Sequence, residues 1–337
     1  MKIGACAAAT AITLCTISAH AQSDAEFFKG RTVEIYIGYT VGGGYDLYAR
    51  LLARHIGKHI PGNPTVIAKN MEGAASLRLA NWLYQIAPKD GTVFGTIGRG
   101  TAFDPILGLK GAQFDGTRFT WIGSANDEVS VCVSWYTSGV KTFEDARTKE
   151  LTIGATGPSD DTVQFPRVLN AVVGTKFNII SGYPGGNDVV LAMERREVQG
   201  RCGWSWSSAK IAHRTWIDEK KINVLIQLSL AKHPDLPDVP LITDYATSEE
   251  QKQIIKLIFA RQVMGRPFLA PPGVPAERVE ALRRAFMDTM NDSDFLADAE
   301  SSQFEITPVS GGRVQTLVDE IYGTPSEIGR KAAAILQ

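Results

Sequence analysis

The fold can be predicted from the stretch VEIYIGYTVGGGYDLYARLLARHI, residues 33–56. Residues 33–39 place apolar side chains at every second position, which is the period of a β-strand. After the glycines at 42–44, apolar residues recur at the spacing of one helix face. The stretch therefore predicts a strand, a glycine turn and a helix, the repeating unit of an α/β fold.

The three glycines stand where the helix is expected to begin. A glycine turn exposes backbone N–H groups, and a helix N-terminus carries partial positive charge, so this position favours an anion. Asp46 lies in the first turn of the helix and can pair with Arg50 one turn later. We expect the rest of the chain to place a second wall opposite this turn.

Strand and helix patterns alternate along most of the chain. Further strands are predicted at 65–70, 92–98, 151–155 and 223–229, and the β-rich segment 120–139 can carry the chain between two domains. Asn187 is expected as a helix N-cap, Ser248 and Gln251 have capping-box spacing, and Pro166 fits a helix only in its first turn. The three prolines in 232–240 predict an extended connection, and one or two helices are expected from residue 311 onward.

We therefore predict two α/β domains, the first from 24–128 and 243–337 and the second from 129–242. Ligands collect at the carboxyl ends of the strands in such sheets.

The first 21 residues have the pattern of a signal peptide. Lys2 precedes an apolar run, and Ala19-His20-Ala21 is a small-x-small cleavage site, so we predict cleavage after Ala21. The alternatives are a membrane anchor and a buried helix, but the apolar run is short for a span. The mature chain should be soluble in the periplasm. There Cys132 and Cys202 can form a disulfide or remain as buried thiols.

The composition is that of a soluble globular protein, with 44% hydrophobic and 21% charged residues and a net charge of −1. This charge, together with the lack of a basic run, argues against a nucleic-acid partner. No nucleotide, P-loop or hydrolase motif is complete, so no cofactor and no catalytic residue is predicted. His55 and His59 have a spacing that can bind a metal, but packing is the expected role.

The remaining polar signal is a set of glycine and hydroxyl turns at strand ends in both halves. Arg99 either forms a bidentate pair with a carboxylate or lies on the surface, and Asp160-Asp161 either caps a helix or holds a cation. Trp204 and Trp206 either line a pocket or fill the core. The candidate ligand-binding residues are Tyr39, Thr40, Gly42, Gly43, Gly44, Ser76, Arg99, Thr156, Gly157, Ser159, Asp160, Thr162, Tyr183 and Trp204.

Several motifs resemble one known family. They are IGYTVGGGYDLYAR, NMEGAAS, APKDGT, ATGPSDDTVQFP, SGYPGGND with ERREVQGRCGW, LPDVP and FLAPPGVPAERV. In this order and spacing, from about residue 27 to the C-terminus, they resemble the Bug-type extracytoplasmic receptors of tripartite tricarboxylate transporters. The resemblance implies a type II periplasmic-binding fold, in which two domains close about a two-strand hinge on a small carboxylate.

The resemblance also implies delivery of the solute to the membrane subunits of a transporter, by a monomer that catalyses nothing. In the family, loops that match 39–44 and 156–162 embrace the ligand carboxylate. This chain has Val41 where many members have proline, Ala75-Ser76 within a commonly glycine-rich run, and Pro158-Ser159-Asp160 where many have Gly-Ser. The alternatives are a secreted enzyme that uses Asp160-Asp161 or Cys202, and a receptor that feeds a sensor protein.

Overall fold

The structure is a computed structural model that describes residue 1 and residues 23–336, so the predicted signal peptide falls almost wholly outside the described residues. The strands are β1 Thr32–Ile37, β2 Thr65–Asn70, β3 Val93–Thr96, β4 Thr120–Ser124, β5 Ser130–Trp135, β6 Leu151–Ala155, β7 Phe177–Ser181, β8 Gly200–Ser205, β9 Ile222–Leu228, β10 Pro267–Ala270 and β11 Val309–Ser310. In the described part of the chain, no helix is both long and apolar enough to cross a membrane.

The helices are distributed along the whole described chain. The α-helices are α1 Asp24–Phe28, α2 Gly44–His55, α3 Leu77–Gln85, α4 Phe143–Thr148, α5 Asp161–Val173, α6 Gly186–Glu194, α7 Trp206–Asp218, α8 Glu249–Phe259, α9 Ala276–Met290, α10 Ser293–Ser301, α11 Gly311–Tyr322 and α12 Ser326–Leu336. The 3₁₀ helices are η1 Ile56–Lys58, η2 Thr101–Phe103, η3 Gly116–Arg118, η4 Ile242–Tyr245 and η5 Ala260–Met264.

The strands form two sheets with the same internal order. The first sheet runs β11-β4-β10-β3-β1-β2 and the second runs β7-β6-β8-β5-β9. In each sheet three strands are parallel (β1 with β2 and β3, β6 with β7 and β8), and one strand from a different part of the chain joins them antiparallel (β10, β5). The carboxyl ends of the parallel strands therefore lie along one edge of each sheet.

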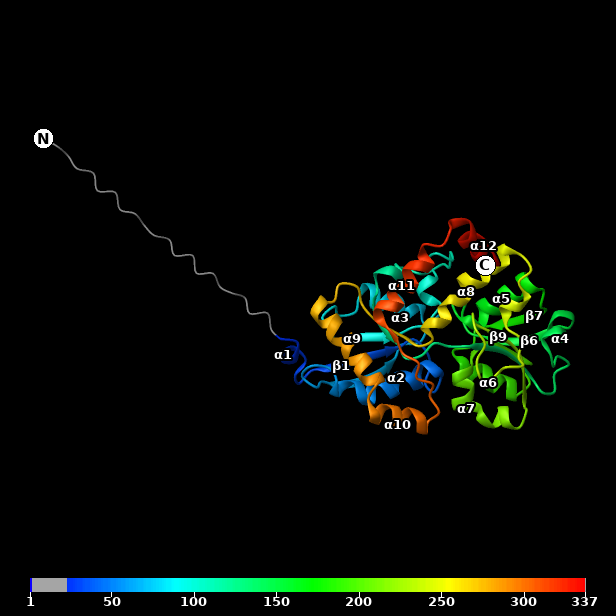
Figure 1. The fold of residues 1–337 in the computed structure, drawn as a ribbon, viewed down its shortest axis with the longest axis horizontal. Coiled ribbons are helices and arrows are strands. Elements are labelled where there is room, and N and C mark those ends of the chain that lie inside the picture. Colours follow the sequence, from blue (N-terminus) through cyan, green and yellow to red (C-terminus); the bar gives the residue numbers. More distant parts are fainter. Residues whose placement is uncertain (2–22, 337) are drawn as a thin grey trace.

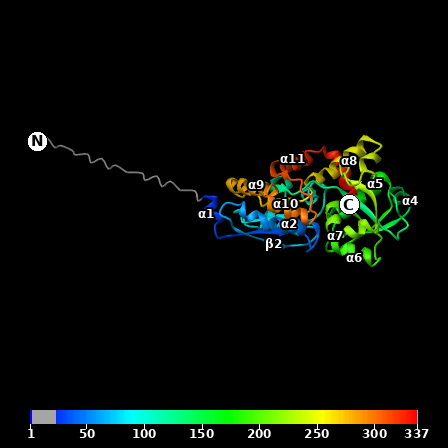
Figure 2. The ribbon, with the colours of Figure 1, turned by 60° about the horizontal axis from the view of Figure 1, so that its bottom comes forward.

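Helices cover both faces of each sheet and define two lobes (Figures 1 and 2). In the first lobe, apolar residues of α2, α9 and α10 pack on one face of the sheet, and those of α3 and α11 pack on the other. In the second lobe, α6 and α7 cover one face and α5 covers the other. This layering buries the apolar stripe that the sequence places on each helix.

Two chain segments connect the lobes side by side, as a two-strand hinge. In segment 125–129, the N–H of Glu128 donates to the carbonyl of Gln262 at 2.8 Å. In segment 260–266, the N–H of Gly265 donates to the carbonyl of Asn126 at 2.9 Å. Because the crossings bond to each other, they constrain the lobes to move about a common axis.

Helices α8 and α12, which the sequence analysis grouped with the first domain, contact α5 of the second lobe. Gln251 of α8 donates to the carbonyl of Val172 at 2.9 Å, and Arg167 of α5 donates to the carbonyl of Leu336. Figure 1 shows both helices on that side of the molecule. The exact residues at which the two predicted domains divide stay a prediction.

Most predicted elements are present, and the capping box at Ser248 is confirmed. The N-cap prediction for Asn187 is wrong, because α6 begins two residues earlier, with Gly185 at the cap. Pro166 lies in the second turn of α5 and not in its first turn. Packing explains this exception to proline avoidance, since most residues of α5 are buried between β8 and the neighbouring helices.

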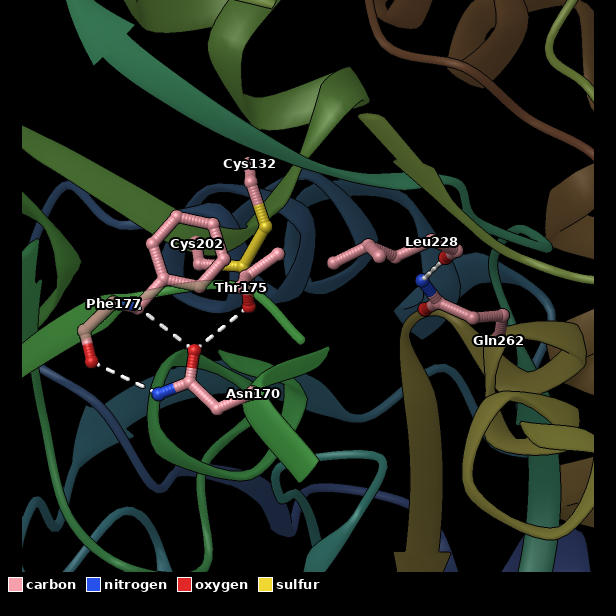
Figure 3. Close-up of a disulfide and its surroundings, with 7 residues drawn as sticks. All are labelled: Cys132, Asn170, Thr175, Phe177, Cys202, Leu228 and Gln262. Atoms are coloured by element: carbon pink, nitrogen blue, oxygen red, sulfur yellow. Dashed lines mark hydrogen bonds between the residues drawn. A yellow bond between two sulfur atoms is a disulfide. The ribbon is translucent and has the colours of Figure 1, made fainter. Parts of the chain in front are cut away.

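Cys132 and Cys202 form a disulfide between the adjacent strands β5 and β8 (Figure 3). Both cysteines are buried, and Asn170 nearby binds the chain at Thr175 and Phe177 with its side-chain amide. The alternative of two buried free thiols is therefore not the one that the structure adopts. The bond therefore links β8 covalently to β5.

Replacing both cysteines with alanine should lower the free energy of unfolding by about 2–4 kcal/mol, because the bond closes a loop with a sequence separation of 70. Urea unfolding with and without reductant measures this loss. Reductant should destabilise the wild type and leave the double variant unchanged. Equal effects of reductant on both proteins, or two alkylatable thiols in the native exported chain, would contradict the assignment.

Candidate functional site

A cavity lies between the lobes, where the carboxyl ends of β1 and β3 face those of β6 and β8. Its volume is about 70 Å³, which suits a compact ligand. The lining comes from the segments that follow β1, β3, β6 and β7, from β8 and the following helix α7, and from Arg266 of the hinge. The lining residues are Tyr39, Thr40, Gly42, Gly43, Gly44, Tyr45, Leu47, Gly98, Arg99, Gly100, Thr156, Ser159, Asp160, Asp161, Gly186, Asn187, Arg201, Gly203, Trp204, Ser205, Ser208, Ala212, His213 and Arg266.

Four helices begin at this cavity. Their N-caps are Gly43 for α2, Asp160 for α5, Gly185 for α6 and Ser205 for α7. At α2, α6 and α7 the N-cap residue makes no side-chain hydrogen bond to the helix, although Glu128 accepts from the Ser207 N–H of α7 at 3.3 Å. The first N–H groups of a helix have no partner within it and carry partial positive charge, so several helices together make the cavity attractive to an anion.

The glycine turn contributes to the cavity in a more limited way than the sequence suggests. The N–H of Gly42 donates to the Asp46 carboxylate at 2.9 Å, and Arg50 and Asn70 also bind that carboxylate. These contacts lower the pKa of Asp46, although its burial acts in the opposite direction. Gly42 has φ of +81°, a conformation that favours glycine. Gly43 and Gly44 are thus left as the part of the turn that can receive a ligand.

Arg99 is buried and crosses between the lobes. Its side-chain Nε lies 2.7 Å from the Asp161 carboxylate at the start of α5, and its Nη2 donates to Ser205 at 2.6 Å. Arg99 is 2% exposed, so the surface alternative is wrong. The pair joins the end of β3 to the second lobe, and Arg99 already has a carboxylate partner without a ligand.

Arg266, in the hinge segment 260–266, also has a carboxylate partner. Arg266 lies 3.2 Å from Glu128 and donates to Ser205 and Ser208. Both members of this ion pair are buried. Removing either partner would leave an uncompensated buried charge between the two hinge segments.

Asp160 caps α5, as the sequence analysis preferred, because its Oδ1 accepts from the Thr162 N–H at 2.9 Å. Its Oδ2 accepts from the Tyr39 hydroxyl of the first lobe at 2.7 Å. Burial, reinforced by the charge of Asp160, raises the pKa of Tyr39. The Asp160 carboxylate is thus bound on both oxygens and is not presented to the cavity as a bare charge.

Ten of the predicted ligand-binding residues line the cavity, and four do not. The hydroxyl of Ser76 instead accepts from the Gly98 N–H at 2.8 Å, and Thr162 binds Asp160 and Thr156. Gly157 packs near Ala75 of the first lobe, and Tyr183 contacts the core beside α6. Ser76, Thr162 and Gly157 stabilise the loops of the cavity but do not line it. Val41 is 67% exposed and does not line the cavity.

Other lining residues were missed as ligand contacts by the sequence analysis. Arg201 and Ser205 lie on β8, and Asn187 lies where an N-cap was expected. His213 interrupts the helical geometry of α7, with φ of −137° and ψ of 36°. Arg201 was missed because no strand was predicted at 200–205, and nothing local marks Arg266 or His213.

Three consecutive residues before α3 have left-handed backbone conformations. The φ angles of Ala74, Ala75 and Ser76 are 47°, 53° and 73°. Such conformations are unfavourable for residues with a Cβ. The turn is held because Ser76 is fully buried and bound to Gly98 and Thr101, and because Ala75 contacts the Gly157 loop.

Two groups with possible metal ligands have other partners. His55 Nε2 lies 2.9 Å from Asp298, and His59 Nε2 lies 3.2 Å from Asp292. His233, Asp235 and Glu305 also cluster, but the Lys210 ammonium pairs with both carboxylates. These contacts make each group an ion-pair cluster.

No family model matches the chain. The "UPF0065 protein in gbd 5′ region" of Cupriavidus necator is 24% identical over 305 residues, which cover 86% of this chain and 83% of that protein.

Solved structures match nearly the full length. The periplasmic binding protein BugD has a TM-score of 0.72 at 18% identity, over 90% of this chain and 97% of its own. MatC from Rhodopseudomonas palustris with bound malate has a TM-score of 0.70 at 16% identity, over 91% and 99%. The predicted periplasmic-binding fold, and the resemblance to proteins of the Bug type, are confirmed.

Because of His213, the free energy of unfolding is expected to depend on pH. Burial, with the nearby Arg201 charge, lowers the pKa of His213 to about 4. An unfolded histidine titrates near about 6.5, so the unfolded chain binds more protons than the folded chain between these values. The contribution of His213 is therefore present above about pH 6.5 and is lost as the pH falls toward about 4.

Replacing His213 with glutamine should remove this loss. Between about pH 7 and about pH 4.5, the wild type should lose on the order of 1–2 kcal/mol more unfolding free energy than His213→Gln. Urea titrations of both proteins at the two pH values measure the difference, in which the other histidines cancel. Parallel pH profiles would show that His213 is not the responsible group.

Proposed function

We propose that this protein is a solute receptor of the Bug type, exported to the periplasm, that captures a small carboxylate between its lobes. The convergence of helix N-termini on one cavity carries the proposal, because α2 of the first lobe and α6 of the second provide N–H donors and positive potential for an anion from both sides. The likeness to BugD and to MatC with bound malate supports it. The protein would deliver the solute, as a monomer, to the membrane subunits of a tripartite tricarboxylate-type transporter.

In the proposed mechanism, a carboxylate binds Gly43 and Gly44 at the start of α2, and the Thr156–Ser159 loop contacts it from the second lobe. Hinge closure then adds the contacts that cross the cleft, including Tyr39 with Asp160 and Arg99 with Asp161. A ligand that binds both lobes shifts the population toward the closed form. No cofactor or nucleic acid takes part in this mechanism.

The residues that the enzyme alternative would use in catalysis all have other partners in the structure. Asp160 is a helix cap, Asp161 is paired with Arg99, and Cys202 is bound in a disulfide. A receptor that feeds a sensor protein has the same cleft and the same closed surface. Incubation of the protein with its solute, followed by NMR of the solute, should return it unchanged; formation of a product would favour the enzyme.

The anion site is tested by three substitutions at Gly43. Its φ of −79° is open to any residue, and an added Cβ would lie 3.7 Å from the carbonyl of Thr40, so each variant should fold. Gly43→Ala should keep ligand affinity within about threefold. Gly43→Asp should lose about 100-fold, because two like charges about 5 Å apart cost about 3 kcal/mol at an effective dielectric constant of about 20.

Gly43→Asn is the matched control, since it has the shape of aspartate without its charge. Isothermal titration with a panel of organic acids gives the affinities, and thermal unfolding checks the fold of each variant. Equal losses for aspartate and asparagine would show that charge at this turn is irrelevant. Absence of binding to any acid of the panel by the wild type would overturn the proposed function.

A further inference from the structure

Arg201 differs from the other two arginines of the cavity in its lack of an ionic partner. Arg99 is paired with Asp161, and Arg266 is paired with Glu128. Within residues 23–336, no carboxylate lies within ion-pair distance of the Arg201 guanidinium, and its buried Nε has no hydrogen-bond partner. A desolvated cation without a counter-ion is unfavourable, so the position calls for an anion.

The guanidinium of Arg201 is nevertheless held in place. Its Nη1 donates to the carbonyl of Gly186 at 3.1 Å, and its Cζ lies 5.0 Å from the centre of the Trp204 ring. A Cβ on residue 186 would lie 2.5 Å from Nη2, so the glycine there leaves room for the guanidinium. A planar donor fixed between a carbonyl and an aromatic face is prepared for bidentate contact with a carboxylate.

The neighbours of Arg201 do not supply the missing charge. His213 is expected to be neutral at ordinary pH. The negative charge of Asp160 acts on Arg201 from beyond ion-pair distance, and both oxygens of that carboxylate are bound, to Tyr39 and to the start of α5. Burial lowers the pKa of Arg201 to about 10, which leaves the group protonated near neutrality. Its positive charge therefore remains available to a ligand.

Arg201 lies on the second lobe, whereas Gly43 and Gly44 lie on the first, and all three line the same cavity. Next to Gly186, the amide of Asn187 lies 3.0 Å from the Cβ position of Gly42, which shows how closely the two walls approach. A single compact ligand can thus contact both walls.

We propose that Arg201 is a specificity-determining residue that binds a second carboxylate of the ligand, so that the receptor selects short dicarboxylates over monocarboxylates of equal length. This inference rests on the proposed function and adds to it the residue that binds the second carboxylate of the solute. Arg99, for which the sequence analysis considered a bidentate pair with a carboxylate, already has Asp161 as its partner.

The test uses matched pairs of acids of two to six carbons: acetate with oxalate, propionate with malonate, butyrate with succinate, pentanoate with glutarate, and hexanoate with adipate. Isothermal titration of the wild type should find a dicarboxylate that binds at least tenfold more tightly than its monocarboxylate. Arg201→Gln should remove that ratio by weakening the dicarboxylate about 10- to 100-fold, with monocarboxylate affinity within about threefold of wild type. Arg201→Lys should recover part of the ratio.

Arg214→Gln is the control, because it makes the same chemical change on the outside of α7, where Arg214 is 54% exposed and paired with Asp218. It should leave every affinity unchanged, and thermal unfolding confirms that each variant is folded. Binding of monocarboxylates with equal or greater affinity, or a ratio that survives Arg201→Gln, would overturn the role of Arg201 while the receptor function stands. Failure of every acid to bind would overturn both.

Discussion

The site depends on one electrostatic constraint: several helices direct their positive ends into one small volume. Parallel strands make this arrangement possible, because each strand that ends at the cleft is followed by a turn and then by a helix that starts there. Two sheets with corresponding strand orders, one of six strands and one of five, bring such starts together from both sides of the cavity. Without compensation these positive ends would repel one another, so the site requires acidic residues or an anion between them.

The protein supplies part of that compensation itself. Asp160 and Asp161 stand at the beginning of α5, where a carboxylate is favoured, and they contact Tyr39 and Arg99 of the other lobe. Glu128 in the hinge performs the same role for Arg266. Closure therefore brings opposite charges together at the base of the cleft, while the part around Gly43 and Arg201 keeps an excess of positive charge for the solute.

Local patterns were sufficient to predict the frame of the molecule. The alternation in 33–39, the glycines at 42–44 and the strand at 151–155 follow from short-range rules, and they locate two walls of the cavity. The partners of charged side chains could not be predicted in this way. Arg99 meets Asp161 across the cleft, and Arg266 meets Glu128 between the two hinge segments, and periodicity does not encode such long-range pairings.

The contacts that cross the cleft have a consequence for the rate at which solute leaves. To open, the lobes must separate the buried Arg99–Asp161 pair and the Tyr39–Asp160 hydrogen bond before water can restore the lost contacts. That step adds to the activation barrier for dissociation, whereas solute that enters the open form meets no such barrier. For the proposed receptor, this architecture favours long residence of the solute, and rapid transfer would then require a partner that draws the lobes apart.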